Sequence, residues 1–140
     1  MPIENLARSD VVTAEPDESI YELAETMRDE DVGSVVIVDG NSPVGIVTDR
    51  DLTMQVLAER VDPDEISAED VMSGDVQTIA HDAGFYEAAE LMSEHGIRRL
   101  PITGSDDELE GIITVDDMTE LLADEHQQLA GIIQAQRPSY

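Results

Sequence analysis

The sequence predicts an α+β fold made of two similar halves of about 60 residues, each with the element order β-α-β-β-α. Three observations lead to this prediction. The chain has 140 residues, of which 41% are apolar, and this suits one compact domain or two very small ones in contact. The chain matches itself when it is shifted, and the apolar patterns of helix and strand recur in the same order in both halves. Because neither half can bury much core alone, we expect the two to pack on each other about a pseudo-twofold axis.

An internal repeat relates the two halves. At a shift of 65 residues, identical residue types coincide at Val11 and Val76, Thr13 and Thr78, Asp17 and Asp82, Tyr21 and Tyr86, and Met27 and Met92. After one extra residue in a polar loop of the second copy, the shift becomes 66, and the identities continue at Gly45 and Gly111, Ile46 and Ile112, Thr48 and Thr114, and Asp51 and Asp117. The order of the identities is kept throughout, so chance is a poor explanation for them.

Each copy is expected to open with a short extended segment, at residues 11–14 and 76–80, and to continue with an amphipathic helix. Ser19 and Glu22 have the spacing of a capping box, in which both side chains bond to backbone N–H groups of the first turn. The apolar positions of the helix follow the i, i+3, i+4, i+7 pattern in both copies, at Ile20, Leu23, Ala24 and Met27 and at Phe85, Ala88, Ala89 and Met92.

A hairpin and a second helix complete each copy. Strands are expected at residues 35–38 and 44–47 around a turn at 39–43, and at 100–103 and 109–114 around a polar turn at 104–108. The closing helix is expected over 49–60 in the first copy and over 115–136 in the second, where its apolar side holds Met118, Leu121, Leu122, Leu129, Ile132 and Ile133. A linker at 61–68 separates a first domain, 1–60, from a second, 69–140.

The charge of the chain excludes several classes of function. It holds 33 acidic residues and 7 basic ones, for a formal net charge of −26. Such a surface repels nucleic acid and anionic membranes, and no apolar run reaches the ~20 residues that span a bilayer. The first residues lack a secretory pattern, so we expect a cytoplasmic location. Cysteine and lysine are both absent, which excludes disulfides, thiolate catalysis, a phosphate-loop lysine and Schiff-base chemistry.

The same charge suggests adaptation to salt. Self-repulsion destabilises a compact state in dilute buffer, and salt at 1 M shortens the Debye length to ~3 Å. Acid enrichment together with the loss of lysine leads to the hypothesis of a halophilic protein, and an ordinary acidic protein is the weaker alternative.

Two segments of the form Gly-Ile-aliphatic-Thr-x-x-Asp occupy corresponding places in the copies, at residues 45–51 and 111–117. Glu-Asp-Val-Met at 69–72 and His-Gly-Ile-Arg-Arg-Leu-Pro-Ile at 95–102 accompany them. From Ile3 to His126 the chain thereby resembles a tandem pair of cystathionine β-synthase (CBS) domains, also called a Bateman module. Two such motifs in an internal duplication are a strong indication of the fold.

The resemblance implies that the two repeats pack sheet to sheet and that a ligand binds in the cleft between them. The family commonly binds adenine nucleotides (AMP, ADP or ATP), and some members bind S-adenosylmethionine. Its phosphate and ribose contacts correspond to Thr48 with Asp51 and to Thr114 with Asp117. The resemblance also implies a homodimer formed through helices, and the apolar side of the last helix fits that.

The residue types agree with this implication. Thr and Asp three positions apart share a face of the first helical turn. The carboxylate can accept hydrogen bonds from two neighbouring ribose hydroxyls, whereas the Thr hydroxyl and the free N–H groups of the helix N-terminus can donate to a phosphate. The residue types alone equally allow an alternative, in which Thr48 and Thr114 only cap their helices and the acids only complement the helix dipole.

An anionic ligand needs local positive charge on this chain. Arg98 and Arg99 are adjacent at the entry to a strand, where successive side chains alternate between faces, so we expect only one of them to face the cleft. Their guanidinium forks suit phosphate oxygens. Arg50, inside the first motif, is a further candidate. The sequence leaves open which cleft the arginines serve, and salt bridges are an alternative role for them.

The remaining arginines lie far from the motifs in the sequence, at Arg8, Arg28, Arg60 and Arg137. The first copy has Gly33 and Ser34 where the second has Arg98 and Arg99, so we expect the two sites to differ in affinity.

The chain is poor in aromatic residues, so an adenine pocket would have aliphatic walls. The candidate walls are Val12, Thr13, Val32 and Ile46 in one copy and Thr78, Ile79, Ile97 and Ile112 in the other. Each of these residues is also an ordinary core candidate.

The sequence therefore predicts a stand-alone regulatory module that binds an adenine nucleotide and alters an unidentified protein target. The alternative is a ligand-free CBS module that acts by pairing with an enzyme or transporter. We expect no catalytic residues, no metal and no cofactor, so an enzyme is the least favoured reading.

Overall fold

The computed structural model describes residues 2–136. Met1 and residues 137–140, and with them Arg137, lie outside the described part of the chain. The first copy contains β1 (Thr13–Ala14), α1 (Ile20–Glu30), β2 (Ser34–Asp39), β3 (Ser42–Thr48), α2 (Asp49–Leu52) and a π-helical segment (Thr53–Leu57). The second contains α3 (Ala68–Val71), β4 (Ile79–Ala80), α4 (Phe85–His95), β5 (Arg99–Thr103), β6 (Leu109–Thr114) and α5 (Val115–Gln136). A short 3-10 helix, Ile3–Asn5, precedes the first copy.

Each copy has a three-stranded mixed sheet. The strand orders are β1-β2-β3 and β4-β5-β6. In both sheets the first pair is parallel and the second is antiparallel. The registers also correspond, because Val36 pairs with Ile46 in one hairpin and Pro101 pairs with Ile112 in the other. The predicted α+β fold with two equivalent repeats is therefore confirmed.

The two sheets pack face to face. Along β2, Val35 and Ile37 belong to the core beneath the helices of the first copy. Val36 and Val38 point to the opposite face of the sheet, yet they are only 1% and 8% exposed. Since the helices of their own copy cover the other face, the second sheet must cover this one. A backbone hydrogen bond of 2.8 Å from the Leu109 N–H to the Asn41 carbonyl joins the two hairpins directly.

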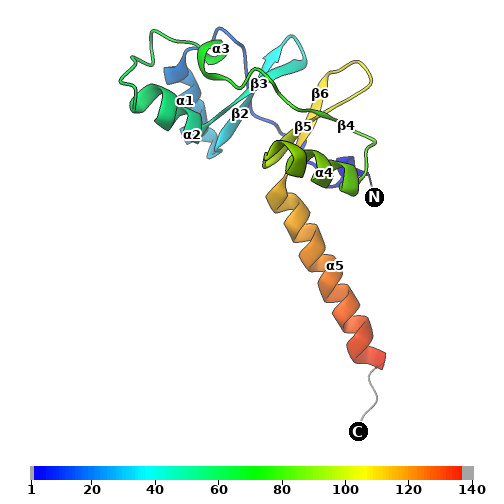
Figure 1. Ribbon diagram of the computed structural model, residues 1–140. Helices are drawn as coiled ribbons and strands as arrows, with labels where there is room; N and C mark the ends of the chain where they lie inside the picture. The colour runs from blue at the N-terminus through cyan, green and yellow to red at the C-terminus, as the bar shows by residue number, and fades with distance from the viewer. Residues whose placement is uncertain (1, 137–140) are drawn as a thin grey trace.

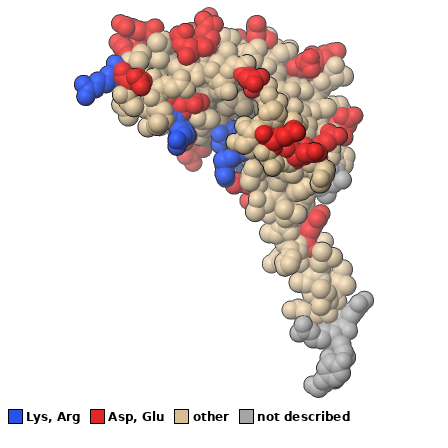
Figure 2. All heavy atoms as spheres, viewed as in Figure 1, with Lys and Arg blue, Asp and Glu red and all other residues tan. Residues whose placement is uncertain are grey.

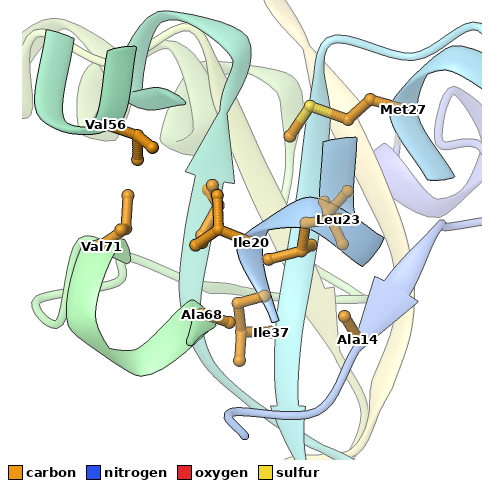
Figure 3. Close-up of a cluster of buried hydrophobic side chains, with 10 residues drawn as sticks. Ala14, Ile20, Leu23, Met27, Ile37, Val56, Ala68 and Val71 are labelled. Atoms are coloured by element: carbon orange, nitrogen blue, oxygen red, sulfur yellow. The ribbon is translucent and has the colours of Figure 1, made fainter. Parts of the chain in front are cut away.

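The segments that lead into the two copies are exchanged. The N-terminal helix Ile3–Asn5 packs on the second copy, where Ile3 is fully buried and its N–H donates to the Ala83 carbonyl at 2.9 Å. In Figure 1 the blue N-terminal helix accordingly lies beside α4. In return, α3 packs on the first copy, and Figure 3 shows Ala68 and Val71 beside Ile20 and Val56 in that core. Each copy therefore needs a segment from the other half of the chain to complete its core.

Two glycines allow the exchanged segments to approach the sheets. The N–H of Ser73 donates to the Ile46 carbonyl on β3, and the N–H of Arg8 donates to the Ile112 carbonyl on β6. A Cβ at Gly45 would lie 2.5 Å from the Met72 sulfur, and a Cβ at Gly111 would lie 2.8 Å from the Arg8 carbonyl oxygen. Both distances are too short for a real contact, so the close approach explains a glycine at each position.

The extended segments expected at 11–14 and 76–80 form strands only at Thr13–Ala14 and Ile79–Ala80. Two further differences from the sequence prediction lie in the hairpin and the last helix of the first copy. The helix expected over 49–60 ends at Leu57, and its second half is a π-helical segment in which the Ala58 N–H reaches the Thr53 carbonyl. The turn expected at 39–43 is shorter, because Ser42 already pairs with Asp39. Gly40 has a φ of 67°, and this left-handed conformation lets the hairpin reverse in two residues.

The last helix extends away from the body of the molecule (Figure 1). Met118 is buried near its start, but Leu122, Leu129, Ile132 and Ile133 are each more than half exposed. The expected apolar side is thus present, and most of it is uncovered in the single chain. Within the described residues, no helix combines the length and the apolar character that crossing a bilayer requires.

Candidate functional site

Two clefts lie between the copies, and the internal repeat relates their walls. The first cleft has a volume of about 280 Å³, which is near the lower end of the range for small-molecule sites. Its floor comes from β3 and α2 of the first copy, and its other walls come from the second copy. The lining residues are Ile46, Thr48, Asp51, Ser73, Asp75, Val76, Gln77, Ile97, Arg98 and Arg99.

The second cleft is the counterpart of the first, with a volume of about 440 Å³. Here β6 supplies the floor, and the first copy supplies the facing walls through the segment before β1 and the α1–β2 loop. The lining residues are Arg8, Asp10, Val11, Val12, Glu30, Asp31, Val32, Gly33, Ser34, Val36, Arg99, Ile112, Thr114 and Asp116.

Thr48 and Asp51 form the capping box of α2 in the first cleft. The Thr48 N–H donates to Asp51 Oδ2 at 2.9 Å, and the Asp51 N–H donates to Thr48 Oγ1 at 3.1 Å. The capping role is therefore present, but it occupies only one carboxylate oxygen. Asp51 Oδ1 has one long contact among the described side chains, 3.5 Å from Gln55 Nε2. Asp51 Oδ1 and the Thr48 hydroxyl hydrogen thus stay available to a molecule in the cleft.

Thr114 and Asp117 repeat this box at the start of α5. The Thr114 N–H donates to Asp117 Oδ2 at 3.2 Å, and the Asp117 N–H donates to Thr114 Oγ1 at 3.1 Å. The second oxygen is not free here, because Arg8 Nη2 and Nε donate to Asp117 Oδ1 at 3.2 and 3.3 Å. The Asp117 side chain is only 9% exposed, and Asp117 is not among the residues that line the second cleft.

Arg8 lies far from the motifs in the sequence but in contact with one of them in the structure. The exchange of leading segments places the N-terminus on the second copy, and an antiparallel bridge between Arg8 and Ile112 fixes the backbone there. Distance along the sequence therefore did not predict that Arg8 contacts a motif. The repeat contains the missing signal, because Arg8 stands at the position that Ser73 occupies in the other copy.

The structure brings Arg98 and Arg99 to the first cleft, together with Thr48 and Asp51 of the other copy. Both arginines line it, so the expectation that only one would do so is wrong. Strand alternation does not constrain Arg98, because β5 begins at Arg99. Arg98 Nη2 lies 3.5 Å from Asp116 Oδ1, and both side chains are at least 70% exposed. An ion pair this exposed contributes little, which leaves Arg98 able to turn toward an anion.

Arg50 has a different placement. It is exposed on α2 and is not among the residues that line either cleft. Figure 2 shows acidic residues over much of the visible face and arginines in only a few places. Because cations are so scarce, the pair at Arg98 and Arg99 is the main positive feature of the first cleft.

The candidate walls come together across the copies. Ile46 and Ile97 both line the first cleft, and Val12, Val32 and Ile112 line the second. The other candidates are not among the lining residues of these clefts. Ile79 is 5% exposed in the core of the second copy, Thr78 is half-buried, and Thr13 is exposed on β1.

Apart from Val12, the segment that leads into each copy was not predicted from the sequence to form a cleft wall. Ser73, Asp75, Val76 and Gln77 line the first cleft, and the equivalent stretch from Arg8 to Val12 lines the second. The repeat could have indicated this, because Asp10 and Asp75 coincide at the shift of 65 residues.

Comparison with known proteins gives the family. The protein-family model described as "CBS domain" matches the chain twice, at residues 3–58 and 68–124. The chain therefore belongs to the CBS domain family and contains a tandem pair of these domains. The uncharacterized protein MK0525 of Methanopyrus kandleri is 44% identical over 117 residues, which are 83% of this chain and 60% of that protein. The chain thus spans less than two thirds of the length of this relative.

Solved structures of related CBS pairs contain adenosyl ligands. The CBS domain pair of protein MJ0100, in complex with 5-methylthioadenosine and S-adenosyl-L-methionine, has a TM-score of 0.79 and 25% identity, and the match covers 89% of this chain and 98% of that one. The CBS domain protein PAE2072 of Pyrobaculum aerophilum, complexed with AMP, has a TM-score of 0.76 and 25% identity over 84% and 89% of the two chains.

Enzymes match over a small part of their length only. The inosine-5′-monophosphate dehydrogenase of Methanocaldococcus jannaschii is 33% identical over 110 residues, which make up 78% of this chain and 21% of the enzyme.

Proposed function

We propose that this CBS pair is a regulatory module that binds an adenine nucleotide, or a related adenosyl compound such as S-adenosylmethionine, in its first cleft. The observation that carries the proposal is the Oδ1 of Asp51, whose described side-chain contact is the long one of 3.5 Å to Gln55, in the same cleft as Arg98 and Arg99. A ribose needs an acceptor for its hydroxyls, and a phosphate needs donors with positive charge. The ligands of the related MJ0100 and PAE2072 structures support the choice of an adenosyl group.

The three parts of such a ligand have matching partners in the first cleft. Asp51 Oδ1 accepts hydrogen bonds from the ribose hydroxyls. Ile46 and Ile97 enclose the adenine ring from opposite copies. The phosphate lies toward Arg98 and Arg99, whose guanidinium groups donate in pairs to its oxygens. Since these partners come from both copies, a bound ligand would link them and bias their relative arrangement.

Calorimetric titration tests this proposal. AMP, ADP, ATP and S-adenosylmethionine are titrated separately into the protein in molar KCl, and we expect at least one of them to bind with measurable heat and a raised Tm. Asp51→Asn should weaken binding by roughly tenfold or more, because it removes a charged acceptor. Asp106→Asn is the matched control, since it makes the same charge change in an exposed turn. Absence of heat and of a thermal shift with all four ligands would refute the proposal.

We also propose that a second copy of the chain covers the exposed side of α5. Residues 127–136 contain no charged residue in a chain of net charge −26. Leu129, Ile132 and Ile133 are each more than half exposed in this stretch. Two copies that approach elsewhere bring acidic surfaces together, whereas contact along this stretch adds no repulsion and buries apolar area.

The oligomeric state tests the dimer. Light scattering after size exclusion in molar KCl should give twice the mass of the 15.3 kDa chain. Leu129→Glu with Ile133→Glu should give the single-chain mass with unchanged circular dichroism. A wild-type protein that runs as a single chain, or a double variant that remains dimeric, would contradict this part of the proposal.

A ligand-free interaction module remains the second candidate function. The uncovered apolar side of α5 favours it, because such a surface also suits a protein target. A folded protein that responds to none of the four ligands but captures an enzyme or transporter through α5 would support it.

A further inference from the structure

We propose that Arg8 closes the second cleft to a ribose, so that each chain binds one nucleotide rather than two. The proposal rests on the proposed function and specifies which cleft performs it. The two boxes Thr48–Asp51 and Thr114–Asp117 have the same internal hydrogen bonds. The difference between the clefts therefore lies outside these boxes, and one part of it lies in the exchanged segments that pass over them.

Arg8 occupies the acceptor that a ribose would need. Two of its nitrogens donate to Asp117 Oδ1, and the capping box already uses Oδ2. Hydrogen bonds between a guanidinium and a carboxylate are stronger than those from a neutral hydroxyl. A ribose in the second cleft must displace Arg8 and leave its charge without this partner, whereas a ribose in the first cleft finds Asp51 Oδ1 nearly unoccupied.

The internal repeat allows Arg8 to be compared with the residue at the same position in the first cleft. Its counterpart in the first cleft is Ser73, and both backbones are held alike: the N–H of Arg8 donates to the Ile112 carbonyl at 3.0 Å, and that of Ser73 to the Ile46 carbonyl at 3.1 Å. A serine side chain is too short to reach across to Asp51 as Arg8 reaches Asp117. The same backbone placement thus gives an open carboxylate in one cleft and a covered one in the other.

The charges that line the two clefts also favour a phosphate in the first cleft over one in the second. The first is lined by two acids and two arginines, and the phosphate end of a ligand would meet Arg98 and Arg99. The second is lined by Asp10, Glu30, Asp31 and Asp116 with two arginines, of which Arg8 is engaged with Asp117. Gly33 and Ser34 stand where the first cleft has its arginine pair, so a phosphate there faces mostly negative charge apart from Arg99, which lines both clefts.

Exchanging the two residues tests the proposal. In calorimetry with AMP in molar KCl, we expect the wild type to bind one AMP per chain, Arg8→Ser to gain a second and weaker site, and Ser73→Arg to lose roughly tenfold or more in affinity at the first site. Arg8→Ser combined with Asp117→Asn should return to one AMP per chain. Arg28→Ser makes the same charge change on α1, where Arg28 pairs with Asp29, and should leave the stoichiometry at one.

The outcomes separate this proposal from the proposed function. Two AMP per wild-type chain, or one AMP per chain in Arg8→Ser as in the wild type, would overturn the role of Arg8 while the proposed function stands. If the wild type and Arg8→Ser both bind no AMP and no other adenosyl ligand, both proposals fail. A ligand-free arm compares the Tm of Arg8→Ser, Asp117→Asn and the double variant. The loss of Tm in the double variant should be smaller than the sum of the losses in the two single variants. Additive losses of Tm would show that Arg8 and Asp117 do not form a pair.

Discussion

The two oxygens of Asp51 have different surroundings, so the residue can cap its helix through one oxygen and leave the other for the proposed ligand. Oδ2 accepts a hydrogen bond from the Thr48 N–H at 2.9 Å and closes the capping box. Oδ1 takes no part in the box, and Asp51 lines the first cleft. The capping alternative and the binding alternative that the residue types allowed are therefore compatible. The residue types alone could not predict the contrast with Asp117, because Arg8 reaches it from 109 positions away in the sequence.

His81 gives a prediction on pH at the same scale. Its Nδ1 lies 3.1 Å from Glu4 Oε2, and this hydrogen bond is the largest cause of a raised pKa of His81; burial opposes it, and the nearby charges of Glu110, Asp82 and Glu4 add to it. A histidine whose pKa is higher in the folded state stabilises it below the unfolded pKa of about 6.5, and this contribution is lost as the pH rises through the folded pKa.

The measurement is the Tm of the wild type and of His81→Gln across that range. The Tm of the wild type should exceed that of His81→Gln by more at about pH 5.5 than at about pH 8.5, because the protonated imidazole gains more from Glu4 than the neutral one. The difference in Tm between the two proteins cancels the contribution from the titration of the many other acids. A difference that is constant with pH would show that the contact between His81 and Glu4 does not form.

At the scale of elements, the exchanged leading segments define how the two halves fit together. The order of helices and strands could be predicted from apolar periodicity and from the repeat, and the start of β6 at Leu109 and of α5 at Val115 agree with the structure. The exchange could not be predicted that way, because the segments around Ile3 and Ala68 are short and their burial depends on the other half of the chain. Periodicity describes which face of an element is apolar, but not which neighbour covers it.

Gly111 tests the fit of the N-terminal segment on β6. A Cβ there would lie 2.8 Å from the Arg8 carbonyl oxygen, which is backbone, whereas a Cβ at Gly45 would meet the side chain of Met72, which can move. Gly111→Ala should therefore lower the free energy of unfolding by about 1–3 kcal/mol, and Gly45→Ala by less.

Denaturant unfolding in molar KCl measures both changes. Gly74→Ala is the control, since a Cβ at that position meets nothing within 4 Å. If Gly111→Ala were as stable as Gly74→Ala, the N-terminal segment would not lie on β6 as described.

At the scale of the whole molecule, the net charge of −26 dominates the electrostatics of the protein. Its effect is visible around Glu18, whose pKa is raised by burial first and then by the charges of Glu22, Asp17 and Glu15. Carboxylates this close together favour the protonated form of the carboxyl group, or screening of their charges by salt, over the unscreened charged form. The few arginines therefore matter: Arg98 and Arg99 line the first cleft, and of the two arginines that line the second, Arg8 pairs with Asp117.

Salt should accordingly stabilise the fold. Raising KCl from about 0.2 M to about 2 M should raise the Tm by at least about 5 °C, because the shorter Debye length screens the repulsion between the acids. Thermal melting followed by circular dichroism measures this. A Tm that stays constant or falls over this range would contradict the hypothesis that the chain is adapted to a salt-rich solvent.

The most direct test of the account is the structure of crystals grown from molar salt with AMP. We predict one nucleotide per chain in the first cleft, with its ribose hydroxyls on Asp51 Oδ1, its adenine between Ile46 and Ile97, and its phosphate beside Arg98 and Arg99. Density for AMP in the second cleft alone, or two empty clefts at saturating AMP, would contradict it.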